Sequence, residues 1–425
     1  MKTLNSSEII QSILIPCKDL QLGEFNVASA CSTFIIQFYE SKRKGWHLLK
    51  KFIKFLFYKN QDHKNFYRLV KNHSVKNVIT FSTSRKTHEE LLKKYTILFD
   101  IKDNHVIYNF KDKHSFSPNI LSFLIAAKYC YQNKICTKFS ITSLCLFLSV
   151  FELIINKREL DKYFKGSINK FNYICLNSAW NIEHIYTQYF KSAGCRTFTF
   201  QHAAFCDFEH ALPIELNNYT NIASDYFLAW GEFTTSQVSK YFPDAVKVLH
   251  VGNPVVEDFF QKYAYAPAEV KSNIIFVALP RIFYKEEITD LLKLFESSTV
   301  IQNYLLKVRL HPSMSSEVFF ECVQENTKLN IEIDEYLSIH ESILAHKPDI
   351  IISFNSSIIF ELLNFSEIIY MFLSKRNDFK IDQLASFSNQ SELINLMTKS
   401  NQSKISSNYF FDGKDAPKLK KILAN

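Results

Sequence analysis

The chain has little glycine and no glycine-rich loop of a known nucleotide-binding type. Only 7 of its 425 residues are glycine, and neither a G-x-G-x-x-G sequence nor a Walker-type loop occurs. Both loops need glycine because the backbone there must approach a phosphate closely. Their absence excludes Rossmann dehydrogenases and P-loop enzymes from the candidate functions.

Paired cysteines and a secretory leader are also missing. The nine cysteines form no C-x-x-C pair and no Cys/His cluster with zinc spacing, so we interpret them as reduced thiols that fill core positions. The first twelve residues lack the basic start and apolar run of a signal peptide. We therefore predict a cytoplasmic protein.

No apolar run is long enough to span a membrane. The most apolar segment, Ile141 to Ile155, is short and contains Glu152, which predicts a buried helix. Lys42 to Lys59 alternates Lys and Arg with aromatic and aliphatic residues. This pattern favours either an amphipathic helix on an anionic membrane surface, at the inner face of the plasma membrane, or a domain helix with a solvated basic face. No nucleic-acid module accompanies it, so nucleic acid is not an expected partner.

What is present indicates a two-domain globular protein of the α/β class. Apolar residues make up 47% of the chain, and its length allows two domains of ordinary size. The formal net charge of +8 suits an anionic substrate or an anionic membrane surface. The composition shifts between Phe260 and Ser272, which predicts domains over residues 1–262 and 263–425. The first would carry a helical N-terminal extension, and the last helix of the second could pack back on the first.

Short apolar runs alternate with helical patterns, which predicts parallel sheets with ligands outside the carboxyl ends of the strands. The first half is predicted to hold a strand at Val75 to Phe81, two short strands within Tyr95 to Phe110, and two long helices within Ile120 to Asn156. The later predicted strands are Tyr173 to Leu176, Arg196 to Phe200, Tyr226 to Trp230, Lys247 to Val251, Asn273 to Leu279, Tyr304 to Leu310, Leu329 to Ile333, Ile350 to Ile352 and Glu367 to Phe372.

The stretch Asp349 to Glu361 (DIIISFNSSIIFE) predicts a strand, a small polar turn and a helix start. Backbone N–H groups at the helix start and the hydroxyls of Ser356 and Ser357 would form a pocket for a phosphate. Glu361 lies about one helical turn further along, where it would reach a sugar hydroxyl beside that phosphate. The alternative for this stretch alone is an ordinary N-cap followed by a packed helix.

His311 and Pro312 follow the predicted strand Leu305 to Leu310, one β-α-β unit before the serine turn. Pro312 ends the strand, and His311 would hold an oxygen of a leaving phosphate at the same sheet edge. Arg281 and Arg309, with Lys307, would offset further phosphate charge. No Asp-x-Asp motif lies at a strand end, so we expect no metal site and no cofactor.

A set of motifs in fixed order resembles the GT-B glycosyltransferases of bacterial surface polysaccharides. The motifs are Gln201-His202, Trp230-Gly231, Val251-Gly252-Asn253-Pro254, Arg309-Leu310-His311-Pro312 and Ser353-Phe354-Asn355-Ser356-Ser357 with Glu361. They are similar to those of capsule and lipooligosaccharide transferases, His-Pro motif sialyltransferases and CDP-glycerol glycerophosphotransferases, over about Tyr173 to Phe372.

The resemblance implies two Rossmann-like domains with a cleft between them, an acceptor-binding first domain and a donor-binding second domain. It implies that His311, Ser356 and Ser357 bind the donor phosphate. Pro312 and Asn355, beside them in the chain, are included in the predicted donor site. The resemblance implies in addition that Glu361 binds the donor ribose, and that the donor is a CMP-linked acid sugar such as sialic acid or Kdo. The acceptor would be a surface glycan or its lipid-linked precursor.

The chain departs from this pattern at the residue that would act as the base. Ala203 replaces the glycine that follows the Gln-His pair in many relatives, and the acidic motif that supplies the base in several sialyltransferases is not evident. We predict His202 as the base, because a neutral imidazole at a strand end can take the acceptor proton. Asp207, Glu209 and Glu183 are the reserve candidates.

Other functions remain open at the sequence level. UDP-sugar transfer and a CDP-glycerol-type phosphotransfer would use the same fold. A UDP-sugar 2-epimerase is a further alternative, suggested by Gly252-Asn253-Pro254, although Asn355-Ser356-Ser357 replaces that family's paired glycines. A non-catalytic scaffold at a membrane, held by Lys42 to Lys59, is the alternative from a different class.

Overall fold

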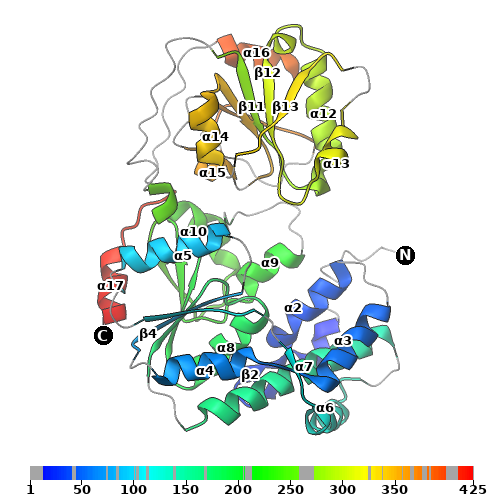
Figure 1. The fold of residues 1–425 in the computed structure, drawn as a ribbon, viewed down its shortest axis with the longest axis vertical. Helices are drawn as coiled ribbons and strands as arrows, with labels where there is room; N and C mark the ends of the chain where they lie inside the picture. Colours follow the sequence, from blue (N-terminus) through cyan, green and yellow to red (C-terminus); the bar gives the residue numbers. More distant parts are fainter. Residues whose placement is uncertain are drawn as a thin grey trace.

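The structure is a computed structural model. It describes residues 13–40, 45–72, 75–82, 86–99, 101, 105–111, 114–136, 140–166, 170–203, 205, 213–257, 272–323, 327–336, 338–356, 358–363, 368–375, 381, 384–398 and 410–424. Two parallel six-stranded sheets form the centres of two domains (Figure 1). The two-domain α/β architecture expected of the GT-B class is therefore confirmed. The predicted boundary at residue 262 lies outside the described residues.

The first sheet has the strand order β10-β9-β8-β7-β4-β5, and all of its pairings are parallel. Its strands are β4 (Asn77–Phe81), β5 (His105–Asn109), β7 (Asn172–Cys175), β8 (Arg196–Phe200), β9 (Tyr226–Ala229) and β10 (Lys247–His250). Every residue of β4 and β7 is buried. Both faces of the sheet are covered by helices, which is why these strands read as continuous apolar runs.

The second sheet has the order β13-β12-β11-β14-β15-β16 and is also parallel throughout. Its strands are β11 (Ile274–Ala278), β12 (Leu305–Arg309), β13 (Asn330–Ile333), β14 (Ile350–Ser353), β15 (Ile369–Phe372) and β16 (Ser386–Phe387). Its helices are α12 (Lys285–Glu296), α13 (Ser316–Phe320), α14 (Ile339–His346), α15 (Ile358–Glu361) and α16 (Gln390–Thr398).

The first domain carries most of the helices. They are α2 (Val27–Glu40), α3 (Gly45–Phe57), α4 (Asp62–Asn72), α5 (Lys86–Leu98), α6 (Ile120–Gln132), α7 (Ile141–Phe164), α8 (Asn181–Ser192), α9 (Pro213–Thr220) and α10 (Glu232–Val238). Two small antiparallel hairpins pair β1 (Gln21–Leu22) with β2 (Phe25–Asn26), and β3 (Tyr58–Asn60) with β6 (His114–Phe116). The 3-10 helices are η1 (Ile15–Cys17), η2 (Ser239–Tyr241), η3 (Ile282–Tyr284) and η4 (Ile301–Asn303).

Helix α7 is the central helix of the N-terminal helical layer. Twelve of its side chains are buried, and α2, α3, α4, α6 and α8 all pack on it. The prediction of a buried helix at Ile141 to Ile155 is confirmed. None of the described helices combines the length and the apolar character that a membrane-spanning helix requires.

The last described helix, α17 (Ala416–Ala424), returns to the first domain, where Leu419 and Leu423 pack with residues of β4, β7, β8 and β10 (Figure 1). Asp415 joins this segment to β10, because its carboxylate accepts from His250 N–H at 3.0 Å and its own N–H donates to His250 O at 2.8 Å. Gly231 marks a close approach, since a Cβ there would lie 2.6 Å from Phe410 O.

The sequence predictions of the strands are largely correct, but one is wrong. The nine strands predicted from Tyr173 onward and the strand at Val75 to Phe81 are all found. Within Tyr95 to Phe110, β5 is present, whereas residues 95–98 belong to helix α5. Leu91, Leu92 and Tyr95 recur at helical spacing and are all buried, so this periodicity outweighs the strand propensity of the segment.

Candidate functional site

The carboxyl edge of the first sheet gathers polar side chains, as expected of a parallel sheet. Gln201 comes directly after β8 and is fully buried. Its Oε1 accepts from Trp230 N–H at 2.8 Å, and its carbonyl accepts from the Trp230 indole N–H at 3.0 Å. Gln201 therefore ties the exits of β8 and β9 together and fixes the start of the loop that carries His202.

His202 is half-buried at this edge. Its Nε2 lies 3.4 Å from Asn177 Nδ2, and its ring lies edge-on to the rings of His88 and Phe205 at centroid separations of 5.9 Å and 5.5 Å. The amide nitrogen can only donate, so this geometry assigns a lone pair to Nε2 in the neutral ring. The reserve candidates Asp207 and Glu209 lie outside the described residues.

Glu183 lies beside the same edge, in the first turn of α8, and is only 2% exposed. Its carboxylate accepts from Ser82 Oγ at 2.7 Å and from Asn177 N–H at 2.9 Å. Burial raises the pKa of Glu183 to about 7, although these hydrogen bonds favour the charged form. Ser82, Glu183, Asn177 and His202 thus form a continuous line of polar groups.

The line of polar groups begins at a cavity of about 340 Å³ that the sequence did not indicate. Ser82 and Phe110, which follow β4 and β5, line it together with residues of α2, α3, α7 and α8. Its lining combines Lys51 and Lys54 with Asp62, Glu152 and Tyr58. Ammonium, carboxylate and aromatic groups together suit a hydroxylated ligand.

At the second sheet, His311 and Pro312 form a turn at the exit of β12. Met314 N–H donates to His311 O at 2.8 Å, which closes the turn around Pro312. Ser313 N–H donates to His311 Nδ1 at 3.1 Å, which leaves Nε2 as the protonated nitrogen of the neutral ring. Ser313 Oγ also lies 3.5 Å from Ile282 N, so the loop that carries the exposed Arg281 lies next to this turn.

The turn after β14 carries Asn355, which is 8% exposed and has a φ of 44°. Asn tolerates this left-handed conformation better than most residues. Ser356 is half-buried, and Ser357 lies outside the described residues. The following helix α15 spans only Ile358–Glu361, so the helix dipole contributes less here than the sequence predicted.

Glu361 ends α15 in the neighbourhood of two groups from other elements. Burial raises the pKa of Glu361 to about 7, and the nearby Arg309 guanidinium opposes that shift. The backbone of Glu361 hydrogen-bonds His340 of α14, whose pKa is lowered to about 4 by burial. Lys94 of α5, in the first domain, also lowers the pKa of His340, so α5 and α14 lie close across the domain junction.

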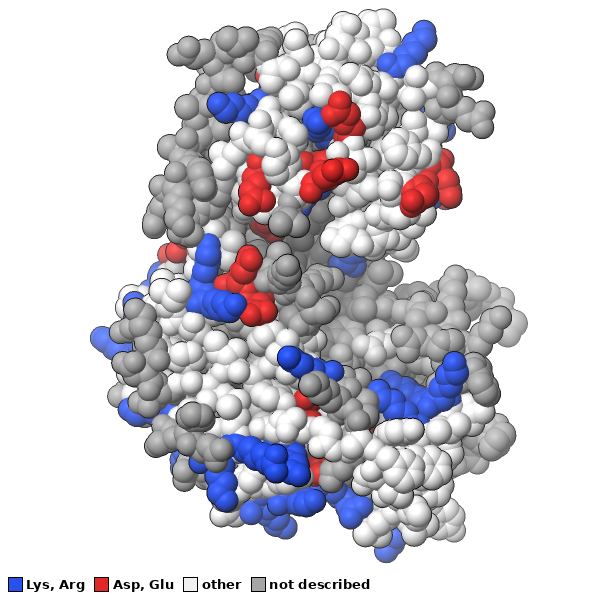
Figure 2. Space-filling view, in the orientation of Figure 1, with Lys and Arg blue, Asp and Glu red and all other residues white. Residues whose placement is uncertain are grey.

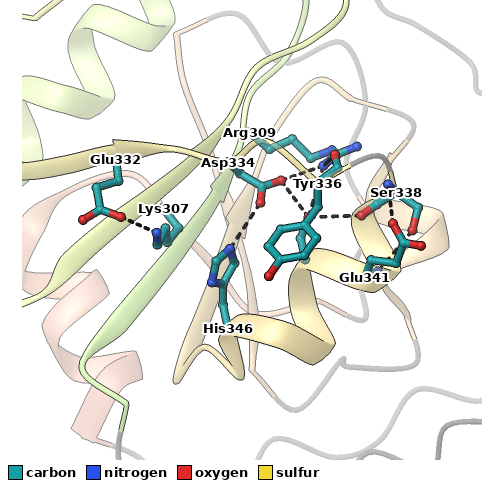
Figure 3. A network of polar contacts seen from close by, with 9 residues as sticks. Lys307, Arg309, Glu332, Asp334, Tyr336, Ser338, Glu341 and His346 are labelled. Carbon is teal, nitrogen blue, oxygen red and sulfur yellow. Dashed lines mark hydrogen bonds and ion pairs between the residues drawn. The ribbon is translucent and has the colours of Figure 1, made fainter.

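Arg309 is held mainly by Asp334 rather than by the turn after β14 (Figure 3). Its Nη1 donates to Asp334 Oδ2 at 2.6 Å, to Tyr336 O at 2.9 Å and to Ser342 Oγ at 3.1 Å. His346 Nε2 lies 3.2 Å from the other oxygen of Asp334, whose side chain is 0% exposed. The predicted contact of Arg309 with a donor phosphate stays a prediction, whereas its contact with Asp334 is direct.

The two carboxyl edges meet at an apolar seam between the domains. Phe233 of α10 packs on Phe360 of α15 with ring centroids 5.0 Å apart. Gln201, Trp230 and Phe360 line one small cavity of about 10 Å³ at this seam. Because His202 follows Gln201 and Glu361 follows Phe360, the two predicted site residues flank the seam from opposite domains. Figure 2 shows the surface hollowed between the two domains.

Among the described residues, one group has the composition and spacing of a metal site. Glu232, His250 and Asp412 place their ligand atoms within 4.8 Å of one another. Lys414 Nζ lies 3.2 Å from Glu232 Oε2 and 3.7 Å from Asp412 Oδ2, so its ammonium supplies positive charge at this point. The group joins α10 and β10 to the C-terminal segment.

A scan against protein-family models and a comparison with curated protein sequences each found no match. Solved structures do match. The UDP-GlcNAc 2-epimerase of Methanocaldococcus jannaschii aligns with a TM-score of 0.49 and 13% identity, over 82% of this chain and 99% of its own. The UDP-GlcNAc 2-epimerase of Neisseria meningitidis bound to UDP-GlcNAc aligns with a TM-score of 0.49 and 11% identity, over 83% of this chain and 100% of its own. The lipopolysaccharide outer core galactosyltransferase WaaB in its apo form aligns with a TM-score of 0.39 and 12% identity, over 82% of this chain and 94% of its own.

Proposed function

We propose that this chain is a metal-independent, inverting GT-B glycosyltransferase that works on the cytoplasmic side of a membrane. Its donor would be a CMP-linked acid sugar such as sialic acid or Kdo, and its acceptor a surface glycan or a lipid-linked precursor. The observation that supports the proposal is the seam between the domains, because Gln201 and Phe360, which line one small cavity there, directly precede His202 and Glu361 in the chain. The eight cysteines that the structure describes are free, as in a reducing compartment.

The proposed reaction is a single in-line displacement. The oxygen of an acceptor hydroxyl forms a bond to the anomeric carbon of the donor sugar while the bond from that carbon to the phosphate oxygen breaks. His202 Nε2 would take the acceptor proton, because it carries the lone pair of the neutral ring and the acceptor hydroxyl would replace Asn177 Nδ2 as its partner. The nucleotide leaves with the bonding electron pair, and one displacement inverts the anomeric centre.

The leaving nucleotide is assigned to the second domain. His311 and Arg281, on adjacent loops, would meet the phosphate, together with Pro312 and the turn of Asn355, Ser356 and Ser357. In the neutral ring His311 Nε2 carries a proton that can be donated to a phosphate oxygen. Glu361 would accept from a ribose hydroxyl, and Arg309, which pairs with Asp334, would add positive charge that offsets the phosphate.

The acceptor is assigned to the cavity of about 340 Å³ in the first domain. The line from Ser82 through Glu183 and Asn177 to His202 joins this cavity to the proposed base. Lys51 and Lys54 of its lining would meet a phosphate or carboxylate of the acceptor, and Asp62 and Glu152 would accept from its hydroxyl groups.

Nucleotide binding tests the proposed donor directly. CMP at a hundredfold excess over its dissociation constant is expected to stabilise the protein by about 2.7 kcal/mol, seen as a rise in melting temperature, with a smaller rise for CDP and UDP. His311→Ala is expected to abolish the rise, whereas Lys293→Ala, on a helix of the same domain, should preserve it. If none of the three nucleotides raises the melting temperature, the transferase proposal fails. If UDP gives the largest rise, a UDP-sugar donor replaces the CMP-linked one.

Removal of the proposed base should slow turnover without loss of donor binding. With CMP-sialic acid as donor and water in place of the acceptor, His202→Ala is expected to lower the rate of CMP release by about 10²- to 10⁴-fold. The melting-temperature rise with CMP should be unchanged. His88→Phe, which keeps a ring beside His202, is the matched control and should stay within a few-fold of the wild type. Near-normal release by His202→Ala would refute the base assignment alone.

A further inference from the structure

Helix α6 turns its large apolar side chains outward. Its inward face carries the small residues Ser122, Ala126 and Cys130, all of which are buried. The outward side chains are between 38% and 59% exposed, and they are Ile120, Leu121, Leu124 and Ile125. A helix on a protein surface normally turns polar residues to water. The outward face of α6 therefore has the composition of a surface that binds a membrane or another protein.

Helix α3 and the β3–β6 hairpin extend this face. Their exposed apolar side chains are Leu49, Ile53, Phe57, Tyr58 and Phe116, the last of them 70% exposed. The rings of Phe116 and Phe57 stack with centroids 6.3 Å apart. Asn119, directly before α6, donates from its backbone N–H to Leu56 O and from its side chain to Phe55 O, both at 2.7 Å. The end of α3, the hairpin and the start of α6 thus form one continuous surface.

All formal charges on the segments of this face have one sign. Residues 45–60 and 114–136 contain no Asp and no Glu. Lys50 on α3 and Lys128 on α6 are exposed next to the apolar side chains, and the sequence places Lys42, Arg43 and Lys44 directly before α3. Figure 2 shows the corresponding lower right flank as largely white, with Lys and Arg side chains above it.

The charge pattern distinguishes between two partners for this face, a second copy of the chain and a lipid bilayer. A two-fold dimer through this face would set the same lysines of both copies near one another, with no carboxylate on these segments to offset them. An anionic bilayer instead supplies an acyl region for the apolar side chains and negative headgroups for the lysines.

We propose that the face formed by α3, α6 and the β3–β6 hairpin docks onto an anionic lipid bilayer, with α6 lying in the headgroup region. The docking itself does not depend on the proposed transferase activity. Together with that activity it specifies the acceptor, because α3 contributes both to this face and, through Lys51 and Lys54, to the neighbouring cavity. An acceptor with a lipid tail would then enter the cavity while its tail stays in the bilayer.

Vesicle co-sedimentation of the full chain tests the docking. The wild type is expected to bind vesicles of phosphatidylcholine with phosphatidylglycerol, and to bind vesicles of phosphatidylcholine alone far more weakly. Leu121→Ser combined with Leu124→Ser should weaken binding to the mixed vesicles by about tenfold or more, because two leucine side chains no longer enter the apolar phase. Phe320→Ser, at a side chain that is 50% exposed on α13 of the second domain, should leave binding unchanged.

The basic side chains give a second, independent readout. Lys50→Gln and Lys128→Gln should each weaken binding to the mixed vesicles by about fivefold, and the loss should shrink at high salt. Failure of the wild type to bind mixed vesicles, or equal binding by the Leu121/Leu124 variant, overturns the proposal. Sedimentation velocity showing a dimer that this variant dissociates would assign the face to a second copy instead. The melting-temperature rise with CMP should persist in the variant, which separates this test from that of the transferase site.

Discussion

Arg309→Ala is expected to lower the free energy of unfolding by about 3–5 kcal/mol, the cost of leaving one partner of a buried ion pair behind. The side chain of Asp334 is 0% exposed and receives Arg309 Nη1 at 2.6 Å. Without the guanidinium, the carboxylate keeps Ser342 and His346 but loses its permanent positive charge. Denaturant unfolding followed by circular dichroism measures the loss.

Lys307 on the same strand is the matched control. It pairs with Glu332, whose side chain is 53% exposed, so Lys307→Ala should cost less than about 1 kcal/mol. Adding Asp334→Asn to Arg309→Ala should recover part of the loss, because the buried charge is then removed as well. Equal costs for Arg309→Ala and Lys307→Ala would show that burial of Asp334 does not determine the effect.

Glu183→Gln is expected to change the pH dependence of stability by about 2–3 kcal/mol between pH 5 and pH 8. The pKa of Glu183 is raised from its ordinary value of 4.5 to about 7 by burial. Between these two values the folded chain keeps a proton that the unfolded chain has released, so the free energy of unfolding falls as the pH rises. Glutamine does not titrate, and the variant should therefore gain stability relative to the wild type over this window.

The difference between variant and wild type is the quantity to measure. Burial lowers the pKa of both His184 and His340 to about 4. The free energy of unfolding that they contribute therefore rises as the pH rises from about 4 to 6.5. In the wild type this rise masks the fall that Glu183 causes. Glu361→Gln should give a difference curve of the same sign, because burial also raises the pKa of Glu361 to about 7. Parallel curves for Glu183→Gln and the wild type would contradict the raised pKa.

The strands of both sheets could be predicted because they are buried on both faces. One apolar run, Ile350 to Ile352, ends in a polar turn, and β14 coincides with that run. Once the strands are placed, parallel topology brings their following residues to one edge. The positions of His202 and His311 therefore followed from the pattern, although their chemical roles did not.

The partner of Arg309 could not be predicted, because it depends on register between strands. Val308 pairs with Ile333 across β12 and β13, so Arg309, the last residue of β12, lies beside Asp334, the first residue after β13. Nothing in the sequence between them specifies that alignment. The sequence predicted only that Arg309 would offset phosphate charge, whereas the structure pairs its guanidinium with Asp334.

The exposed apolar face of α6 could not be predicted from the sequence, for a different reason. The sequence correctly predicts two helices within Ile120 to Asn156, of which α6 is the first. Both sides of α6 are apolar or small, so periodicity does not say which side is buried. The small side chains of Ala126 and Cys130 allow α6 to approach α7 closely, and this packing turns the larger residues to the surface. The cavity beside α3 likewise exists only after α2, α3 and α7 have packed.

The return of α17 to the first sheet has a consequence for biosynthesis. Leu419 and Leu423 cover apolar residues of β4, β7, β8 and β10, strands that are complete once residue 250 has been made. At the usual rates of translation the covering helix follows roughly 10–35 s later. During that interval the first domain lacks the side chains of Leu419 and Leu423 that cover Leu249 and its neighbours, so the domain that is synthesised first is completed only when the last helix has been made.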